Sequence, residues 1–300
     1  MENVIIIGGG PAGLSAAIYL ARADLKPLVF AGSPPGGQLT LTSEVENYPG
    51  FESILGSELI EKMRNQAKKF GAKIIDENVL KIDLTKPNHK IYITGKEYES
   101  RSVIIATGAK ALWLNIPSET RLRGKGVSAC ATCDGFFFRE KIVAVVGGGD
   151  TALEEALTLT KFAKKVYIIH RRDFFRASKI MQERVLKNEK IEIIWNSMVD
   201  EILGEKKVEG IKIKDLKLGE KNLLVDGVFV AIGHKPDTDL FKGHVELDEK
   251  GYIKILERRK TSVKGVYAAG DCADPYYRQA ITSAGTGVEA SLEVERYLES

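Results

Sequence analysis

The chain has 300 residues, which is enough for two domains or one large α/β unit. Its composition, with 44% hydrophobic and 28% charged residues, is ordinary for a globular protein, and a net charge of +3 is too small to indicate binding to nucleic acid or to an anionic membrane. The apolar runs are shorter than a membrane span, the chain starts with a strand pattern instead of a signal peptide, and three cysteines form no disulfide framework. We therefore expect a cytoplasmic protein.

The first third of the chain has the pattern of a dinucleotide-binding βαβ unit. Residues 3–7 form an apolar run bounded by glycines, which is typical of a buried parallel strand. We then expect a helix over 11–23, a strand over 26–30, a helix over 55–70, short antiparallel strands over 73–100, and a buried strand over 103–108.

The same order of elements is repeated further along the chain. We expect a strand over 141–146, a helix over 151–162, a strand over 165–169, short antiparallel strands over 191–225, and a buried strand over 228–233. Self-similarity over such a long period indicates two related modules. The predicted fold class is α/β, with two Rossmann-like, three-layer domains that each carry a small antiparallel meander.

The last part of the chain repeats nothing in the second module. It contains a strand pattern over 265–271 and a helix pattern over 279–298, which we assign to the first module. The second domain is then inserted into the first. We predict a discontinuous first domain at 1–112 and 245–300, a second domain at 116–243, and linkers near 111–117 and 242–244.

The first glycine-rich turn is Gly8-Gly9-Gly10-Pro11-Ala12-Gly13, between a predicted strand and a predicted helix. Its glycines permit a tight turn and a close approach of the backbone to a pyrophosphate, which the helix N-terminus stabilises. The alternative is a flexible turn without a ligand. Ala31 stands where this fingerprint usually places an acidic residue for the ribose, so another group must hold the ribose.

The second turn is Gly147-Gly148-Gly149-Asp150-Thr151-Ala152. After the next predicted strand come Arg171, Arg172 and Arg176, where a carboxylate would favour an unphosphorylated ribose. Arginines at this place can bind a 2′-phosphate, so the pattern indicates NADPH and not NADH. The alternative reading is a solvated charged surface.

Cys130-Ala131-Thr132-Cys133 is a pair of thiols spaced for a disulfide that forms and breaks repeatedly. Zinc binding is the alternative, but the remaining Cys272 and four scattered histidines do not complete a recognisable ligand set, so we predict no metal. Asp134 can cap the following helix or protonate a leaving thiolate. Cys272 is predicted to be a packing residue.

Two polar segments near the C-terminus complete the pattern. Asp271 follows a buried strand, where its carboxylate can accept hydrogen bonds from the polyol chain of a ligand. Residues 278–281, Arg-Gln-Ala-Ile, open the last predicted helix, whose N-terminus suits partial negative charge.

Taken together, these motifs resemble the low-molecular-weight, flavin-dependent thioredoxin reductases over essentially the whole chain. The shared segments are 8–13, 36–39, 44–50, 130–134, 147–152, 170–176, 270–271 and 278–280. Larger disulfide reductases carry their thiol pair near the first glycine turn and have an additional dimerisation domain, and neither feature is found here. The resemblance implies a homodimer that binds FAD in the split domain and NADPH in the inserted one, and that reduces a thioredoxin-like protein.

The resemblance also implies roles for individual residues. Cys133 is expected to lie nearest the flavin, Cys130 to attack the disulfide of the partner, and Asp134 to act as the acid. The residues expected to bind FAD are Gly8, Gly10, Pro11, Ala12, Gly13, Gly36, Gly37, Gln38, Leu39, Asn47, Ala106, Thr107, Gly108, Gly270, Asp271, Arg278, Gln279 and Ala280. Those expected to bind NADPH are Gly147, Gly149, Asp150, Thr151, His170, Arg171, Arg172, Arg176, Ile232 and Gly233.

The thiol pair and the nicotinamide site fall in one predicted domain, yet both must reach the same flavin ring. We therefore expect the linkers to act as a hinge, so that domain rotation alternates the two half-reactions. Two other functions stay open. One is a related NADPH flavoprotein that reduces ferredoxin or a low-molecular-weight disulfide, and the other is a flavin-bound redox sensor without turnover.

Overall fold

The computed structural model describes residues 1–300 except 42–44, 86–87 and 216–218. The chain forms two compact units. Unit 1 comprises residues 1–110 and 235–300, and unit 2 comprises residues 111–234, so unit 2 is inserted into unit 1. The helices of the described part are all too short or too polar to cross a membrane.

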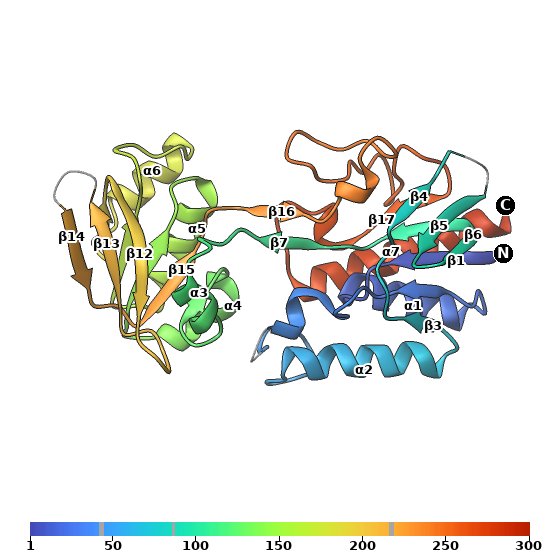
Figure 1. The fold of residues 1–300 in the computed structure, drawn as a ribbon, viewed down its shortest axis with the longest axis horizontal. Helices are drawn as coiled ribbons and strands as arrows, with labels where there is room; N and C mark the ends of the chain where they lie inside the picture. Colours follow the sequence, from blue (N-terminus) through green and yellow to red (C-terminus); the bar gives the residue numbers. More distant parts are fainter. Residues whose placement is uncertain (42–44, 86–87, 216–218) are drawn as a thin grey trace. The chain divides into compact units, whose positions relative to one another are not determined.

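Unit 1 is built on a seven-stranded mixed sheet with the order β3-β2-β1-β6-β5-β4, in which β17 also pairs with β6 (Figure 1). Its elements are β1 (Glu2–Ile7), α1 (Pro11–Arg22), β2 (Leu28–Phe30), α2 (Gly56–Lys69), β3 (Lys73–Ile75), β4 (Lys81–Asp83), β5 (His89–Ile93), β6 (Lys96–Ile105), β17 (Val266–Ala268) and α7 (Ala280–Glu299). The N-terminal half of β6 pairs antiparallel with β5, and its C-terminal half pairs in parallel with β1 and β17.

Strand β1 is buried on both faces, which explains its uninterrupted run of branched apolar residues. Val4 and Ile6 pack with the small apolar residues of α1 and α7. Ile5 and Ile7 face the opposite side of the sheet, where they pack with Phe30, Phe241 and other residues. The alternation follows directly from the two-residue period of a strand.

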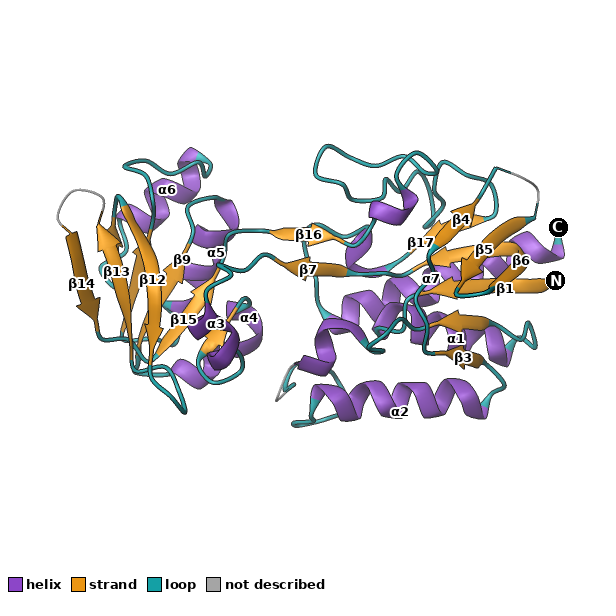
Figure 2. Ribbon diagram, viewed as in Figure 1, coloured by secondary structure: helices purple, strands orange, loops and turns teal. Residues whose placement is uncertain are grey.

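Unit 2 has three layers (Figure 2). Its elements are α3 (Pro117–Leu122), β8 (Val127–Ser128), α4 (Ala131–Asp134), β9 (Ile142–Val146), α5 (Asp150–Leu159), β10 (Lys165–Ile169), α6 (Lys179–Leu186), β11 (Ile191–Ile194), β12 (Ser197–Leu203), β13 (Gly210–Asp215), β14 (Gly219–Leu223) and β15 (Gly227–Val230). A five-stranded parallel sheet has the order β11-β10-β9-β15-β8, and β12, β13 and β14 form a separate antiparallel sheet. Val143 and Val145 face α5, whereas Ala144 and Val146 face the antiparallel sheet.

The antiparallel segments are shorter than the sequence predicts. Strands β3 and β11, expected as the first strands of two meanders, instead join the parallel sheets beside β2 and β10. Each follows a helix, and a helical crossover delivers the next strand parallel to its neighbour. In unit 1 the antiparallel strands β4 and β5 also extend the main sheet instead of forming a layer of their own.

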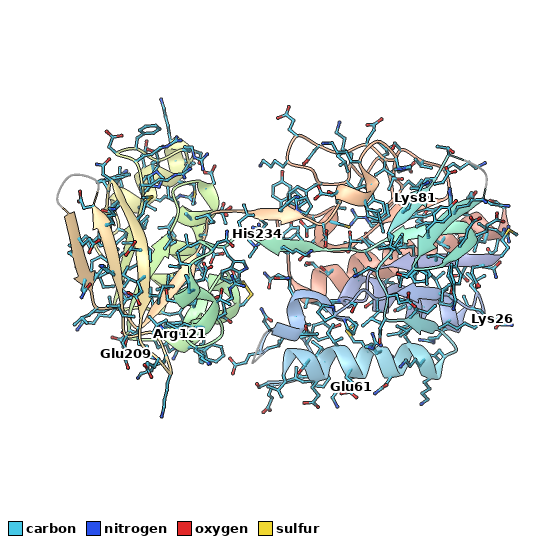
Figure 3. The ribbon with its side chains drawn as sticks, in the orientation of Figure 1. Lys26, Glu61, Lys81, Arg121, Glu209 and His234 are labelled. Atoms are coloured by element: carbon cyan, nitrogen blue, oxygen red, sulfur yellow. A yellow bond between two sulfur atoms is a disulfide. The ribbon has the colours of Figure 1, made fainter. Side chains whose placement is uncertain are left out.

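The return linker also differs from the prediction. The chain passes between the units through two paired strands, β7 (Ala109–Ala111) and β16 (His234–Pro236), and Figure 3 labels His234 at the start of β16. Unit 1 therefore resumes at Lys235, before the predicted linker at 242–244. The reason is Phe241, which is fully buried in the core of unit 1.

The segment that follows β7 is held by a buried carboxylate. Glu119 of α3 has no exposed surface, and it accepts hydrogen bonds from the backbone N–H groups of Leu114 at 2.8 Å and Asn115 at 3.0 Å. The Arg123 guanidinium lies 3.2 Å from the same carboxylate and over the ring of Trp113. This cluster fixes the start of unit 2 to its own first helix.

Candidate functional site

Of the three glycines that form the first dinucleotide fingerprint, Gly8, Gly10 and Gly13, only Gly10 faces open space. A Cβ atom on Gly8 would lie 2.1 Å from the carbonyl oxygen of Ala106, and one on Gly13 would lie 2.0 Å from that of Gly8. Close packing therefore explains these two glycines. A Cβ atom on Gly10 would meet nothing within 4 Å. Gly10 is the N-cap of α1, whose N-terminus has no side-chain cap among the described residues.

This geometry fits a dinucleotide. The free N–H groups and positive end of the α1 dipole face the open space beside Gly10, where a pyrophosphate can be bound. The other residues predicted for FAD, including Gly36, Thr107 and Asp271, all belong to unit 1 as well. The arrangement is therefore consistent with one cofactor site, although Glu44 of the 44–50 motif lies outside the described residues.

Asp271 lies in a 3-10 helix, Gly270–Cys272, immediately after β17. Burial raises the pKa of its carboxyl group, although the hydrogen bond that it accepts from the Ser283 hydroxyl, at 2.7 Å, opposes the shift. The N–H of Gly270 donates to the Thr286 hydroxyl at 2.9 Å. Helix α7 thus holds this acidic turn in place.

Two predicted flavin residues that are far apart in the sequence meet in the structure. The side-chain amide of Asn47 donates to Oε1 of Gln279 at 3.3 Å. Gln279 is itself the N-cap of α7 and forms a capping box with Thr282. The pair therefore joins the 44–50 motif to the start of the last helix.

The loop after β2 has Ala31 at the position where the fingerprint places an acidic residue, and the side-chain amide of Asn78 lies beside this loop. Ala31 is buried, and its N–H donates to the carbonyl of Ile75 at 2.8 Å. The side chain of Asn78 accepts a hydrogen bond from the Ser33 N–H at 3.0 Å. The sequence pattern did not single out Asn78, because only the parallel pairing of β2 with β3 brings it to this loop.

The second glycine turn repeats the geometry of the first in unit 2. A Cβ atom on Gly147 would lie 2.4 Å from the carbonyl oxygen of Ala231, whereas one on Gly149 would meet nothing within 4 Å. Gly149 is the N-cap of α5, and this N-terminus likewise has no side-chain cap in the described part of the chain. Close packing explains Gly147, whereas the open space beside Gly149 and the uncapped N-terminus of α5 fit a second pyrophosphate.

The arginine-rich loop is tied to this turn by backbone contacts. The N–H of Arg176 donates to the carbonyl of Gly148, and the N–H of Ser178 donates to the Asp150 carboxylate, each at 2.8 Å. The residues Arg171, Arg172 and Arg176 are exposed. They are therefore available to a 2′-phosphate on a nucleotide bound at the turn.

His170 differs from these arginines because it is buried. Its Nε2 atom lies 3.0 Å from the carbonyl oxygen of Phe174, and its ring occupies the space that a Cβ atom on Gly148 would need. Burial lowers the pKa of the imidazole. His170 therefore stabilises the arginine-rich loop by its contacts with Phe174 and Gly148. Ile232 and Gly233 lie just after β15, and Gly233 accepts a hydrogen bond from the Leu112 N–H at 2.9 Å.

Cys130 and Cys133 form a disulfide, with their Cα atoms 5.3 Å apart. Cys130 is the N-cap of α4, and its sulfur accepts a hydrogen bond from the N–H of Cys133 at 3.2 Å. Cys130 is half-buried and Cys133 is exposed. The third cysteine, Cys272, is buried in unit 1, as predicted for a packing residue.

Asp134 does not cap the helix that follows it, which is a correction to one of its two predicted roles. The 3-10 helix Gly135–Phe138 starts at Asp134 without a hydrogen bond from its side chain. Burial instead raises the pKa of the Asp134 carboxyl group, with a hydrogen bond to Ser128 as a smaller opposing effect. A raised pKa suits an acid that keeps its proton nearer to neutral pH.

Two residues around the disulfide were missed by sequence reasoning. The Ser128 hydroxyl accepts a hydrogen bond from the Cys130 N–H at 3.1 Å. The Glu155 carboxylate, from α5, accepts one from the Ala131 N–H. Ser128 could have been noticed from its place two residues before Cys130. Glu155 gave no signal, because its contact depends on how α5 packs beside α4.

An exposed aromatic residue lies close to the disulfide in the sequence. Phe136 retains 49% of its surface, and the guanidinium of Arg139 lies 4.5 Å from the centre of its ring. Aromatic residues are enriched among those that carry the binding energy of protein–protein interfaces, so Phe136 is a candidate contact for a partner.

Comparison with known proteins identifies the family. Residues 2–287 match the model of the pyridine nucleotide-disulphide oxidoreductases. A thioredoxin reductase from Rickettsia felis is 56% identical, with 99% of this chain and 98% of the relative covered. The solved thioredoxin reductase from Giardia duodenalis is 46% identical with a TM-score of 0.95 over 99% of both chains. That from Streptococcus pyogenes is 42% identical, also with a TM-score of 0.95, over 100% of this chain and 98% of the other.

These similarities extend over nearly the whole of each chain, so the matched part of this chain includes both glycine turns and the Cys130–Cys133 pair. The low-molecular-weight architecture predicted from the sequence is therefore confirmed at the level of the family and the fold. The chain belongs to the pyridine nucleotide-disulphide oxidoreductases and, within them, to the thioredoxin reductases.

Proposed function

We propose that this protein is an NADPH-dependent thioredoxin-disulfide reductase. The Cys130–Cys133 pair passes two electrons from NADPH to the disulfide of a thioredoxin-like protein, and bound FAD would supply the electron transfer between NADPH and this pair. The observation that carries this proposal is the disulfide at the N-terminus of α4, in the same unit as the arginine-flanked glycine turn. A ferredoxin reductase of related fold would not need that disulfide.

The residues that hold the cofactors follow from the two turns. FAD, when bound, accepts two electrons from NADPH and makes them available to a disulfide. The N–H groups beside Gly10 bind its pyrophosphate, and Asp271 accepts hydrogen bonds from its polyol chain. In unit 2, the N–H groups beside Gly149 bind the pyrophosphate of NADPH, and Arg171, Arg172 and Arg176 bind its 2′-phosphate.

The thiols then carry out two exchange steps. The Cys130 thiolate attacks one sulfur of the partner's disulfide, and a mixed disulfide forms while the other partner sulfur leaves as a thiolate. Cys133 attacks Cys130 in this mixed disulfide, which restores the Cys130–Cys133 bond and releases the second partner sulfur. Asp134, whose pKa is raised by burial, donates a proton to a leaving thiolate. The proton that the Cys133 thiol loses on attack goes to the other leaving thiolate, so that two electrons and two protons reach the partner.

The linker strands provide the place for a conformational step. The thiol pair and the NADPH turn share unit 2, so both must reach a flavin held by unit 1. We propose that the units rotate about β7 and β16, which pair with each other, so that the two half-reactions alternate. We further propose a cytoplasmic homodimer, with Phe136 as part of the surface that receives the partner.

The decisive experiment is an anaerobic titration with NADPH. We expect the flavin absorbance to bleach and two new thiols per chain to become reactive toward a thiol reagent. Turnover is then followed as NADPH oxidation in the presence of a thioredoxin, with ferredoxin and a low-molecular-weight disulfide as alternative acceptors. A protein that bleaches but sustains turnover with none of these acceptors would be a redox sensor instead.

The variant Cys130→Ser separates the two half-reactions. It keeps the flavin and the NADPH turn intact, so flavin reduction should proceed while thioredoxin reduction is abolished. Cys272→Ser is the matched control, because Cys272 is a buried free cysteine of unit 1, whereas the disulfide belongs to unit 2. Unchanged turnover in Cys130→Ser would overturn the assignment.

A further inference from the structure

A carboxylate from α5 is built into the turn that carries the disulfide. The N–H of Ala131, the residue directly after Cys130, donates to Oε2 of Glu155. The N–H of Cys133, two residues further on, donates to the Cys130 sulfur at 3.2 Å. The carboxylate and the sulfur are therefore bound by neighbouring N–H groups of one short turn, Ala131–Asp134.

We propose that Glu155 is a positioning residue that keeps the reduction potential of the Cys130–Cys133 pair low. When the disulfide is reduced, a Cys130 thiolate is stabilised by the hydrogen bond that it accepts from the Cys133 N–H. The Glu155 carboxylate places a second negative charge on the neighbouring N–H of Ala131 and thereby opposes the thiolate. The reduced form is destabilised relative to the disulfide, so the pair gives up its electrons more readily.

The two effects of Glu155, its hydrogen bond and its charge, can be separated by substitution. Glu155→Gln keeps a side-chain oxygen for the Ala131 N–H but removes the charge. Glu155→Ala removes both. Glu154→Gln is the matched control, because Glu154 carries the same charge on the same helix but is exposed.

The potential is measured on the FAD-loaded enzyme without turnover. The protein is equilibrated with mixtures of reduced and oxidised dithiothreitol, in which one dithiothreitol dithiol loses two electrons and two protons as the Cys130–Cys133 disulfide gains them. The reaction is stopped with acid, and the free thiols are tagged with a maleimide under denaturing conditions and counted by mass. Cys272 contributes one constant tag, so two additional tags mark the reduced pair.

A like charge close to a thiol raises its pKa, and we take about one unit for this effect, the lower end of the range for a neighbouring charge. We therefore expect Glu155→Gln to shift the equilibrium toward the reduced pair about tenfold, which corresponds to a potential about 30 mV less negative. The rate of alkylation of Cys130 in the reduced enzyme should reach its plateau at lower pH in this variant. Glu154→Gln should match the wild type in both measurements.

A purely structural role for Glu155 gives a different result. The Glu155→Gln enzyme would then keep the wild-type potential and alkylation profile, and only Glu155→Ala would change, together with its thermal stability. That outcome, or a potential that becomes more negative in Glu155→Gln, overturns the proposal. The proposal for Glu155 depends on the proposed function in one respect, namely that the Cys130–Cys133 pair is redox-active. Because the dithiothreitol equilibrium requires no thioredoxin, a wrong partner assignment would leave this result unaffected.

Discussion

The two open glycine positions give a direct test of which unit binds which cofactor. Gly10 and Gly149 each cap a helix, and a Cβ atom on either would meet nothing within 4 Å. Their φ angles of −83° and −101° are accessible to alanine. Substitution by alanine should therefore leave each unit folded, at a cost of about 1 kcal/mol for a poorer N-cap.

Each substitution should reduce the affinity for one cofactor, and this loss of binding free energy should exceed the loss of folding stability. The added methyl group occupies the space in which the pyrophosphate approaches the helix N-terminus, and it displaces a hydrogen bond to a charged group. Such a bond contributes about 1.5–3 kcal/mol, which corresponds to about 10- to 140-fold in affinity. Gly10→Ala should weaken FAD binding by this factor, and Gly149→Ala should raise the KM for NADPH by it while keeping its flavin.

FAD affinity is measured by titrating the apoprotein and following flavin fluorescence, and NADPH affinity is measured from the bleaching of the bound flavin. Urea unfolding of both apoproteins checks the fold. Gly13→Ala serves as the contrasting variant, because its Cβ atom would lie 2.0 Å from a backbone oxygen and should destabilise the fold by about 1–3 kcal/mol. If Gly149→Ala lost its flavin and Gly10→Ala did not, the assignment of the two units would be reversed.

Three further predictions concern buried groups. Burial raises the pKa of the Cys272 thiol to about 11, so it should resist alkylation in the native enzyme at pH 8 and react only after denaturation; rapid native labelling would contradict its burial. Burial lowers the pKa of His89 below 6.5, against the opposing effects of the Lys264 carbonyl and Asp83. The unfolded chain therefore accepts a proton that the folded state resists, so the free energy of unfolding, measured from urea curves, should fall as the pH drops through 6.5. This fall should be less steep in His89→Gln. Burial raises the pKa of Asp134, so the stability that its protonated form contributes is lost as the pH rises through that pKa. Asp134→Asn should therefore be more stable than the wild type at neutral pH, yet turn over more slowly. A variant that is less stable at neutral pH would refute the direction of this pKa shift.

The buried carboxylate of Glu119 leads to a prediction about stability. Glu119→Ala leaves the N–H groups of Leu114 and Asn115 without their acceptor and should cost about 2–4 kcal/mol. The measurement is chemical unfolding, with Glu154→Gln as a surface control. A loss below 1 kcal/mol would show that water replaces the carboxylate.

The fold could be predicted where local patterns determine it. Residues 4–7 are all buried and pack on alternate faces of the sheet, as the period of a strand requires, and the glycine turns follow from the steric needs of a tight turn. The pairing of β3 and β11 could not be predicted, because short strands of three or four residues look alike in parallel and antiparallel sheets. The return linker was misplaced for a related reason, since nothing local marks Phe241 as part of the unit 1 core.

The candidate site shows the same division. The cysteines, the arginines and the glycines were predicted from spacing, because their chemistry depends on neighbours in the sequence. Glu155 and Asn78 were not, because each reaches its backbone partner across 24 and 45 residues respectively. His170 is predicted to bind NADPH, and its packing against Gly148 of the second glycine turn is a contact that only the tertiary structure reveals.

The strand and helix that complete unit 1 have a consequence for the order in which the protein is made. Residues 111–234 leave the ribosome as a block, so unit 2 has all of its strands before β17 exists. Unit 1 cannot be completed until β17 and α7 have been synthesised. Strand β17 pairs with the end of β6. Helix α7 packs closely on α1, because a Cβ atom on Gly287 of α7 would lie 2.1 Å from the Ala12 carbonyl oxygen. The first glycine turn to be synthesised therefore lies in the unit that is completed last.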